Sequence, residues 1–453
     1  MFYPIRSLFL VLVFTTSLQA YPYVGGELHY STNGSTIVTL NYYAYADSNE
    51  FEGEGFQICF SDGACTQLTQ AESVVASRYN LFQYRYTIAY DFLNYGEHRV
   101  WVVDPNLPEG LCNLNFPNSG TIPFFTEIRF DLQEGVANSS PLFYEPPFIT
   151  TEVEESSTYH PIPIDEEGHR LAYQLVVTGQ DVDTPVPNYQ FPDQISPSAD
   201  NSYTLNGFTG LFTWTSPQVT CGYWLTFEVE EYSVNGTWLS TTMRSVWVDV
   251  QEQDNALPQI LSDPASITAT NLPTTLVVDV ESNDADQEVL LEAYSELLQN
   301  GAASFTAPQD FEPGPVTGQF TLAAGEDLER PYPYYLILRA MDDVSEDEPG
   351  VTFEVVKLAL GELLSASGPL RATIELNLSP NPATDFLNVG WNKDLTEGAR
   401  LEVWQTDGRI VLHQPLDPGQ RALELPVSEW PRGMYWLVVR SSEGWLSQPF
   451  VKQ

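Results

Sequence analysis

The sequence predicts an all-β fold made of several β-sandwich domains, and three observations support this. Aromatic residues make up 13% of the chain, with 24 Tyr and 24 Phe, and such residues favour strands over helices. The 33 Pro and 29 Gly residues are spread along the chain and suit many turns. Short runs of alternating apolar residues recur between these turn residues. The 453 residues, 43% of them hydrophobic and 17% charged, suffice for three or four domains with separate cores.

The first residues have the pattern of a secretory signal peptide. Arg6 precedes an apolar run from Leu8 to Phe14, and the small residue Ala20 follows at a position suited to cleavage. This run is too short to cross a bilayer, and no later stretch is apolar for long enough. We therefore expect residues 1–20 to be removed, and the rest of the chain to be exported without a transmembrane segment.

Residues 21–135 are predicted to form an N-terminal β domain. A hairpin is expected around Asn33-Gly34, because this dipeptide favours a tight turn and the runs on both sides are rich in aromatic and β-branched residues. Further strands are expected at 83–89 and 97–103. This unit carries no recognisable active-site motif.

The four cysteines suit an exported protein. Cys59 and Cys65 flank the turn Ser61-Asp62-Gly63, so we predict a disulfide across a hairpin. Cys112 and Cys221 either pair across a domain junction or remain free buried thiols. Metal ligation by cysteine is not expected, because the chain has no Cys-x-x-Cys pair.

Residues 136–253 and 254–362 are predicted to be a tandem repeat of one sandwich type. Both begin with Asn-x-x-Pro, at Asn138 and Asn255, 117 residues apart, and similar landmarks follow in the same order. Each repeat is predicted to be a β-sandwich. The predicted fold class is therefore all-β with tandem immunoglobulin-like β-sandwich domains. Small residues at 363–370 predict a linker.

The two repeats resemble cadherin-like or related immunoglobulin-like domains. The resemblance is carried by Gln253-Asp254-Asn255-Ala256-Leu257-Pro258 at their junction, by Asp284-Ala285-Asp286 and by Ala340-Met341-Asp342. Cadherins bind calcium between successive domains through such oxygens, so the resemblance implies candidate calcium ligands at Asp254, Asn255, Asp284, Asp286 and Asp342. The first repeat departs from the pattern with Asp165-Glu166-Glu167, and the linker lacks the full acidic run. The alternative interpretation is a set of solvated acidic turns.

Residues 371–453 are predicted to form a further sandwich, because about seven short apolar-alternating runs are separated by turn residues. The segment resembles the type A C-terminal sorting domain of proteins exported by the type IX secretion system of Gram-negative bacteria. The residues that carry this resemblance are Pro380, Asn381, Pro382, Asp385, Gly408, Arg409, Gly433, Tyr435 and Lys452. The final Gln453 is a departure, since family members usually end on a basic residue.

The sorting domain implies a route and a location for the chain. The implied partner is the type IX secretion machinery, and the implied location is extracellular, with attachment to the outer cell surface as one outcome. A peptidase of the export machinery is expected to cut near the linker. The resemblance says nothing about what the protein does after export.

The net charge of −43 is concentrated ahead of the sorting segment. Residues 371–453 hold 8 basic and 10 acidic residues, so −41 falls on residues 1–370. Such a body repels nucleic acid and anionic membrane surfaces. It attracts divalent cations, such as calcium, or basic partners; alternatively, the charge only keeps the surface soluble in a salty medium.

We find no sequence motif for catalysis. The chain has no Gly-x-Ser-x-Gly, no His-x-x-x-His and no phosphate-binding glycine loop. We interpret His160 and His169 as a pair of surface residues. The tryptophans that could stack on sugars are predicted to be mostly core residues, namely Trp214, Trp224, Trp238 and Trp247.

We therefore expect a protein without enzymatic activity. The predicted function is a secreted or cell-surface binding or adhesion protein that contacts surface polysaccharide, matrix or a cell-surface ligand. The alternative is a secreted hydrolase that acts on polysaccharide, with its site in the N-terminal unit or between units. Paired carboxylates could serve such a hydrolase, but 61 acidic residues make this signal unspecific.

Overall fold

The fold was analysed in a computed structural model. It describes residues 23–46, 56–76, 79–104, 106–198, 200–234, 236–252, 255–261, 266–269, 276–283, 287–322, 328, 330, 332–343, 349–360, 376–380, 383–384, 386–391, 399–405, 410–417, 419–428, 430–431, 433–441 and 444–452. The predicted signal peptide and the predicted linker at 363–370 lie outside these ranges. Strands dominate the described residues, and their α-helix content is α1 (Glu296–Gln299), so the all-β prediction is confirmed. None of the helices in the described ranges has the length and apolar character needed to cross a membrane.

The first unit contains the predicted hairpin. β1 (Tyr23–Thr32) and β2 (Ile37–Ala46) pair antiparallel, and Gly34 in their turn has a φ of +87°, which favours glycine. They are the centre of a five-stranded sheet of order β5-β6-β2-β1-β9. Its other strands are β5 (Ser73–Ala76), β6 (Phe82–Asp91) and β9 (Asn138–Ser139).

An eight-stranded sheet runs from the first unit into the second. Its order is β14-β19-β20-β8-β7-β3-β4, and β11 pairs parallel with β20. The join is the pairing of Ser240–Thr242 on β20 with residues 128–130 on β8. The predicted boundary between residues 135 and 136 therefore does not separate two sheets. The strands are β3 (Phe56–Phe60), β4 (Cys65–Leu68), β7 (Gly96–Asp104), β8 (Phe124–Leu132), β11 (Phe148–Glu152), β14 (Arg170–Val176), β19 (Cys221–Tyr232) and β20 (Trp238–Gln251).

Smaller elements complete these two units. A three-stranded sheet of order β12-β18-β17 lies in the second unit, and two two-stranded sheets, β10-β13 and β15-β16, flank it. The elements are η1 (Ser119–Thr121), β10 (Leu142–Phe143), β12 (Ser157–Tyr159), β13 (Pro163–Ile164), β15 (Gly179–Asp181), β16 (Thr184–Pro185), η2 (Pro192–Gln194), β17 (Ser202–Leu205) and β18 (Phe212–Thr215).

Disulfides link Cys59 to Cys65 and Cys112 to Cys221. The first crosses the β3–β4 hairpin, where the two residues are directly paired. The second connects the segment after β7 with the first residue of β19, so it ties the first unit to the second.

The second and third units share one strand order. In the second, β14-β19-β20 continues with a parallel β11; in the third, β24-β28-β29 continues with a parallel β22. This agreement confirms the predicted tandem sandwiches. The strands of the third unit are β21 (Gln259–Ile260), β22 (Ser266–Ala269), β23 (Leu276–Asn283), β24 (Glu288–Tyr294), β25 (Ala303–Thr306), β26 (Glu312–Pro313), β27 (Val316–Leu322), β28 (Tyr334–Asp342) and β29 (Val351–Leu360).

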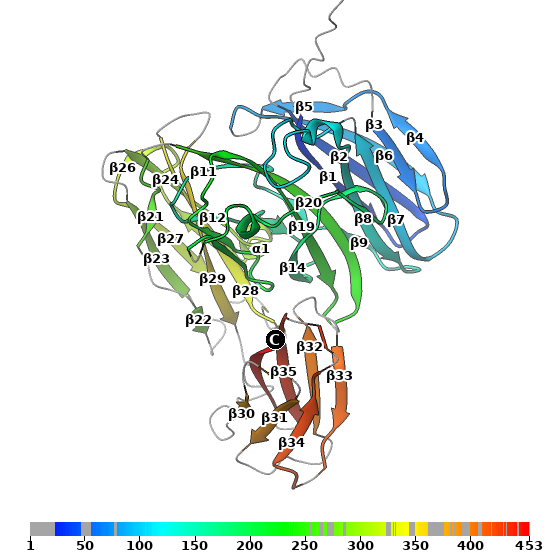
Figure 1. The fold of residues 1–453 in the computed structure, drawn as a ribbon, viewed down its shortest axis with the longest axis vertical. Helices are drawn as coiled ribbons and strands as arrows, with labels where there is room; N and C mark the ends of the chain where they lie inside the picture. The colour runs from blue at the N-terminus through cyan, green and yellow to red at the C-terminus, as the bar shows by residue number, and fades with distance from the viewer. Residues whose placement is uncertain are drawn as a thin grey trace, which may run out of the picture.

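The C-terminal segment is a separate sandwich, drawn in orange to red in Figure 1. Its described residues form two sheets, of order β30-β31-β34 and β33-β32-β35-β36. The seven strands match the predicted number and enclose a core of their own. They are β30 (Leu376–Ser379), β31 (Phe386–Trp391), β32 (Arg400–Gln405), β33 (Ile410–Pro415), β34 (Ala422–Pro426), β35 (Gly433–Ser441) and β36 (Gly444–Lys452).

A chain of buried ionic groups joins the first three units. Arg244 on β20 contacts the carboxylate of Glu27 on β1 and the backbone carbonyl of Glu145. Arg339 on β28 contacts the carboxylates of Glu145 and Glu292. All of these side chains except that of Glu292 are at most 1% exposed. Removing such charges from water is costly, so the network is stable only when each charge meets its partner.

We predict that Arg339→Met lowers the free energy of unfolding by about 3–5 kcal/mol, because it leaves the buried Glu145 carboxylate without its guanidinium partner. Urea unfolding followed by circular dichroism measures this. The matched control is Arg85→Met, since the Arg85 side chain is 44% exposed and pairs with a half-exposed Glu72. This change should cost at most about 1 kcal/mol. Equal losses in the two variants would contradict the role given to the network.

Candidate metal centre

A short loop between β13 and β14 presents Asp165 and His169 to the same side. The Asp165 Oδ1 atom accepts a hydrogen bond of 2.7 Å from the backbone N–H of His169, which closes the loop on itself. Gly168 has a φ of +74°, a left-handed conformation that glycine adopts without strain. The sequence folds this way locally because an aspartate favours such a turn and a glycine permits it.

Glu231 reaches the same place from β19. The register of β19 against β20 shifts between Glu231 and Tyr232, and both residues are buried. Such an irregularity redirects side chains, so a carboxylate near the end of the strand faces inward. The Ser240 hydroxyl on β20 donates a 2.5 Å hydrogen bond to Glu231 Oε2 and fixes the carboxylate.

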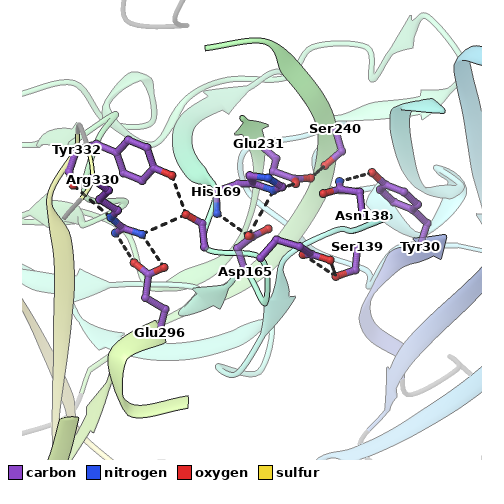
Figure 2. A network of polar contacts seen from close by, with 12 residues as sticks. Tyr30, Asn138, Ser139, Asp165, His169, Glu231, Ser240, Glu296, Arg330 and Tyr332 are labelled. Atoms are coloured by element: carbon purple, nitrogen blue, oxygen red, sulfur yellow. Dashed lines mark hydrogen bonds and ion pairs between the residues drawn. The ribbon is translucent and has the colours of Figure 1, made fainter. Parts of the chain in front are cut away.

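The three side chains converge, as Figure 2 shows. His169 Nδ1 lies 2.7 Å from Glu231 Oε1 and 3.6 Å from Asp165 Oδ1. One ligand atom from each residue lies within 4.8 Å of the other two. The side chains of Asp165 and Glu231 are 3% and 0% exposed, whereas that of His169 is 21% exposed. The cluster is thus a buried pair of carboxylates covered by an imidazole that reaches solvent.

Polar groups from two other units surround the loop. The Ser139 hydroxyl donates to Glu167, and the Asn138 amide donates to the Tyr30 hydroxyl of the first unit. On the other side, Arg330 and Tyr332 of the third unit donate hydrogen bonds of 3.1 and 2.8 Å to the Gly168 carbonyl. Arg330 is in turn paired with Glu296. The loop therefore lies where three units meet (Figure 2).

Burial and mutual repulsion shift the titration of these groups. Burial, followed by the charge of Glu231, raises the pKa of Asp165 to about 8. Burial disfavours the charged form of His169, but its hydrogen bond to Glu231 and the charges of Asp165 and Glu231 outweigh this and raise its pKa. Burial also raises the pKa of Glu167 and that of Tyr30. The cluster thus retains protons that the same groups would release in water.

We predict that the melting temperature falls between pH 5 and pH 8.5 in EDTA, and falls less in Asp165→Asn. The folded state holds the Asp165 proton up to about pH 8, whereas an ordinary aspartate loses it near pH 4. Stability from this group is therefore complete below pH 4 and is lost as the pH rises towards 8, and His169 acts in the same direction. Asparagine keeps the hydrogen bond and does not ionise.

Differential scanning fluorimetry across the pH series measures the effect. Asp183→Asn is the matched control, since that side chain is 82% exposed. Parallel melting profiles for the native chain and Asp165→Asn would contradict the account of the cluster.

Of the residues predicted to bind calcium, Asn255 and Asp342 lie elsewhere, at the junction of the second and third units. Asp254, Asp284 and Asp286 lie outside the described residues. Asn255 and Asp342 are adjacent: the Asn255 amide donates a 2.8 Å hydrogen bond to Asp342 Oδ2. The Gly350 N–H donates to Asp342 Oδ1, and the Gln287 side-chain amide donates to Asn255 Oδ1. The Asn255 backbone N–H also donates a 2.7 Å hydrogen bond to Glu152 of the second unit, so Asn255 links the two units.

Gly350 is required by this arrangement. A Cβ atom at this position would lie 2.2 Å from Asp342 Oδ2 and 2.6 Å from the Asn255 amide nitrogen. The backbone can approach the buried carboxylate only because the residue has no side chain.

The described sorting-motif residues gather at one end of the C-terminal sandwich. Gly433 pairs with Lys452 across β35 and β36, and Ala383 forms a bridge to Lys452 shortly after Pro380. The buried Tyr435 donates a 2.7 Å hydrogen bond to the Pro431 carbonyl. The start and the end of the segment thus meet. The other motif residues lie outside the described residues, namely Asn381, Pro382, Asp385, Gly408 and Arg409.

Two expectations about individual side chains have different outcomes. The interpretation of His160 and His169 as surface residues is wrong: His160 is fully buried and hydrogen-bonded to the Thr209 carbonyl, and His169 belongs to the cluster. Burial lowers the pKa of His160 to about 4. The tryptophans behave as expected: Trp214 and Trp224 are fully buried, and Trp238 and Trp247 are partly buried.

Sequence reasoning named Asp165 and His169 but missed Glu231. This residue is 62 positions from His169 and stands in a long strand with no motif around it. A weak signal exists: Glu230-Glu231 interrupts the aromatic and aliphatic run between Tyr223 and Tyr232.

Comparison with known proteins identifies the C-terminal segment. Residues 377–453 match the family described as "Secretion system C-terminal sorting domain". The segment predicted from its motifs is therefore a sorting domain of the type IX secretion system, so the chain carries a signal for export across the outer membrane by that machinery. No curated protein sequence matches the chain.

Several solved cadherin structures align with the chain at low similarity. Domains EC1-4 of Drosophila N-cadherin share 13% identity, with 89% of this chain and 92% of that chain covered and a TM-score of 0.19. The extracellular domain of protocadherin γB4 shares 14% identity over 88% of this chain, with a TM-score of 0.19. The EC1-4 fragment of PcdhgB3 shares 15% identity over 71% of this chain, with a TM-score of 0.17. The chain covers 59% and 66% of the lengths of these two protocadherin structures.

Proposed function

We propose that this protein, once exported, acts as a binding or adhesion protein that contacts a ligand on a cell surface or in the matrix. The observation that carries this proposal is an exposed apolar patch at one end of the first unit. The patch consists of Ile37, Leu93, Tyr95 and Val136, of which Leu93 is 82% exposed. Exposed apolar side chains on neighbouring turns of an exported protein favour an interaction site.

Hydrogen bonds between three turns hold the patch together. The Gly34 carbonyl accepts from the Gly135 N–H at 2.9 Å and from the Tyr95 hydroxyl at 3.4 Å. A Cβ atom on Gly34 would lie 2.5 Å from the Gly135 backbone, so the turns are pressed closely together. The patch is therefore presented by fixed backbone, which reduces the entropy cost of binding.

The surroundings of the patch favour a protein ligand with apolar and basic side chains. A surface depression beside it is lined by short polar side chains, including Ser31, Asn33 and Ser35. The body of the chain carries the large negative charge, which steers basic partners towards it. Polysaccharide, as a ligand or as a substrate for hydrolysis, is the competing outcome of the experiment below.

We predict that Leu93→Glu weakens ligand binding by at least about tenfold, because it places a charge where an apolar contact forms. The exported full-length protein is applied to immobilised extracellular-matrix proteins, a glycan array and intact cells. Val234→Glu is the matched control, since Val234 is 56% exposed outside the patch. Binding unchanged by Leu93→Glu would contradict the proposal. Polysaccharide turnover abolished by one carboxylate substitution would favour the hydrolase instead.

Calcium at the junction is a finer part of this proposal, supported by the position of Asn255 and Asp342 between the second and third units. We predict that millimolar calcium raises the melting temperature of the full-length chain, because an ion that binds only the folded state stabilises it. This increase should be lost in Asp284→Ala and kept in the control Asp310→Ala. The absence of any shift at millimolar calcium would remove the ion from the proposal.

A further inference from the structure

We propose that Asp165, His169 and Glu231 form a binding site for a divalent transition-metal ion of the zinc class. The three residues supply one imidazole nitrogen and two carboxylate oxygens, which are ligand types that zinc accepts. This site is distinct from the predicted calcium ligands and is independent of the proposed binding function.

Two buried oxygens at the cluster point to a missing ligand. Asp165 Oδ2 has no hydrogen-bond partner within the described part of the chain, although Asp165 is only 5% exposed. The same holds for Asn138 Oδ1, in a residue that is also 5% exposed and lies beside the cluster (Figure 2). A buried polar atom without a partner costs free energy, so such atoms are normally satisfied. A cation between these groups would satisfy the carboxylate.

The spacing of the ligand atoms suits a tetrahedral ion. Zinc bonds of about 2.0 Å place neighbouring tetrahedral ligands about 3.3 Å apart. The two separations from His169 Nδ1, 2.7 Å to Glu231 and 3.6 Å to Asp165, lie on either side of that value. Small rotations of the side chains therefore suffice to bind the ion. A water molecule would fill the fourth position.

The imidazole ligand favours a transition-metal ion over calcium. Calcium takes six to eight oxygen ligands, whereas nitrogen from histidine favours zinc, nickel or copper. Ion entry is possible from the side of His169, which is 21% exposed. In the metal-free state His169 Nδ1 is hydrogen-bonded to Glu231 Oε1, and ion binding would break this bond and release the proton that it holds.

The ion would have a structural role. Glu231 is fully buried, so no substrate reaches the ion from that side. The ligands come from the loop and from β19, and the same loop accepts hydrogen bonds from Arg330 and Tyr332 of the third unit. An ion that fixes the loop therefore strengthens the contact between the second and third units.

The experiment uses the full-length exported protein, first stripped with EDTA. Zinc is titrated by calorimetry, and cobalt is used as a spectroscopic probe, since a bound tetrahedral cobalt ion absorbs visible light more strongly than the hydrated ion. We expect one ion per chain and a rise in melting temperature with zinc. His169→Gln should weaken zinc affinity by more than about tenfold, because losing even an outer-shell partner costs 10–100-fold.

Control variants distinguish zinc binding at this site from nonspecific binding of zinc by the acidic surface. Glu167→Gln alters a neighbouring carboxylate that is bonded to Ser139, and it should weaken zinc affinity far less than His169→Gln does. Asp165→Asn preserves the shape of the side chain and should also weaken zinc binding. This second variant keeps the test valid if His169→Gln misfolds. No zinc uptake by the native chain, or uptake by His169→Gln and Asp165→Asn equal to that of the native chain, would overturn the proposal. If calcium still raises the melting temperature of His169→Gln, that rise comes from the junction and not from the zinc site.

Discussion

The arrangement of the first three units depends on a row of buried ionic contacts. Glu27, Arg244, Glu145, Arg339 and Glu292 come from all three units, and all of these side chains except that of Glu292 are almost entirely removed from water. Burying these charges is unfavourable unless each partner is in place, so the network permits one arrangement of the units and penalises others. This is notable in a chain whose first 370 residues hold only ten basic residues, two of which lie in the network.

The geometry of the candidate metal centre depends on this arrangement of the units. Asp165 and His169 lie in a loop of the second unit, but Ser139, which pairs with β1 of the first unit, and Arg330 and Tyr332 of the third unit hold that loop from both sides. Glu231 lies on β19, whose neighbour β20 pairs with β8 of the first unit and also supplies Arg244. A shift of one unit against another would therefore disturb both the network and the cluster.

Local patterns in the sequence predict the features that depend on near neighbours. The Asn33-Gly34 hairpin follows from turn chemistry, and the C-terminal sandwich follows from evenly spaced strands and its motifs. The tandem order of the second and third units follows from landmarks that recur in the chain.

Features that depend on contacts between residues far apart in the sequence could not be predicted. Nothing around residues 128–130 indicates that this part of β8 pairs with β20, more than one hundred residues later. Arg244 and Arg339 lie within apolar strands, which suggests buried charges. Their partners Glu27 and Glu145 are determined only by the packing of the units. Glu231 was missed for the same reason, and the loop that carries His169 was interpreted as a solvated surface.

Calorimetry of the full-length chain, with the sorting domain retained, tests the central claim most directly, because a shared ionic core makes the three units one cooperative body. Residues 23–360 should unfold in a single transition, separate from that of the sorting domain, with a calorimetric enthalpy equal to its van't Hoff enthalpy. Separate transitions for the first, second and third units would contradict the account.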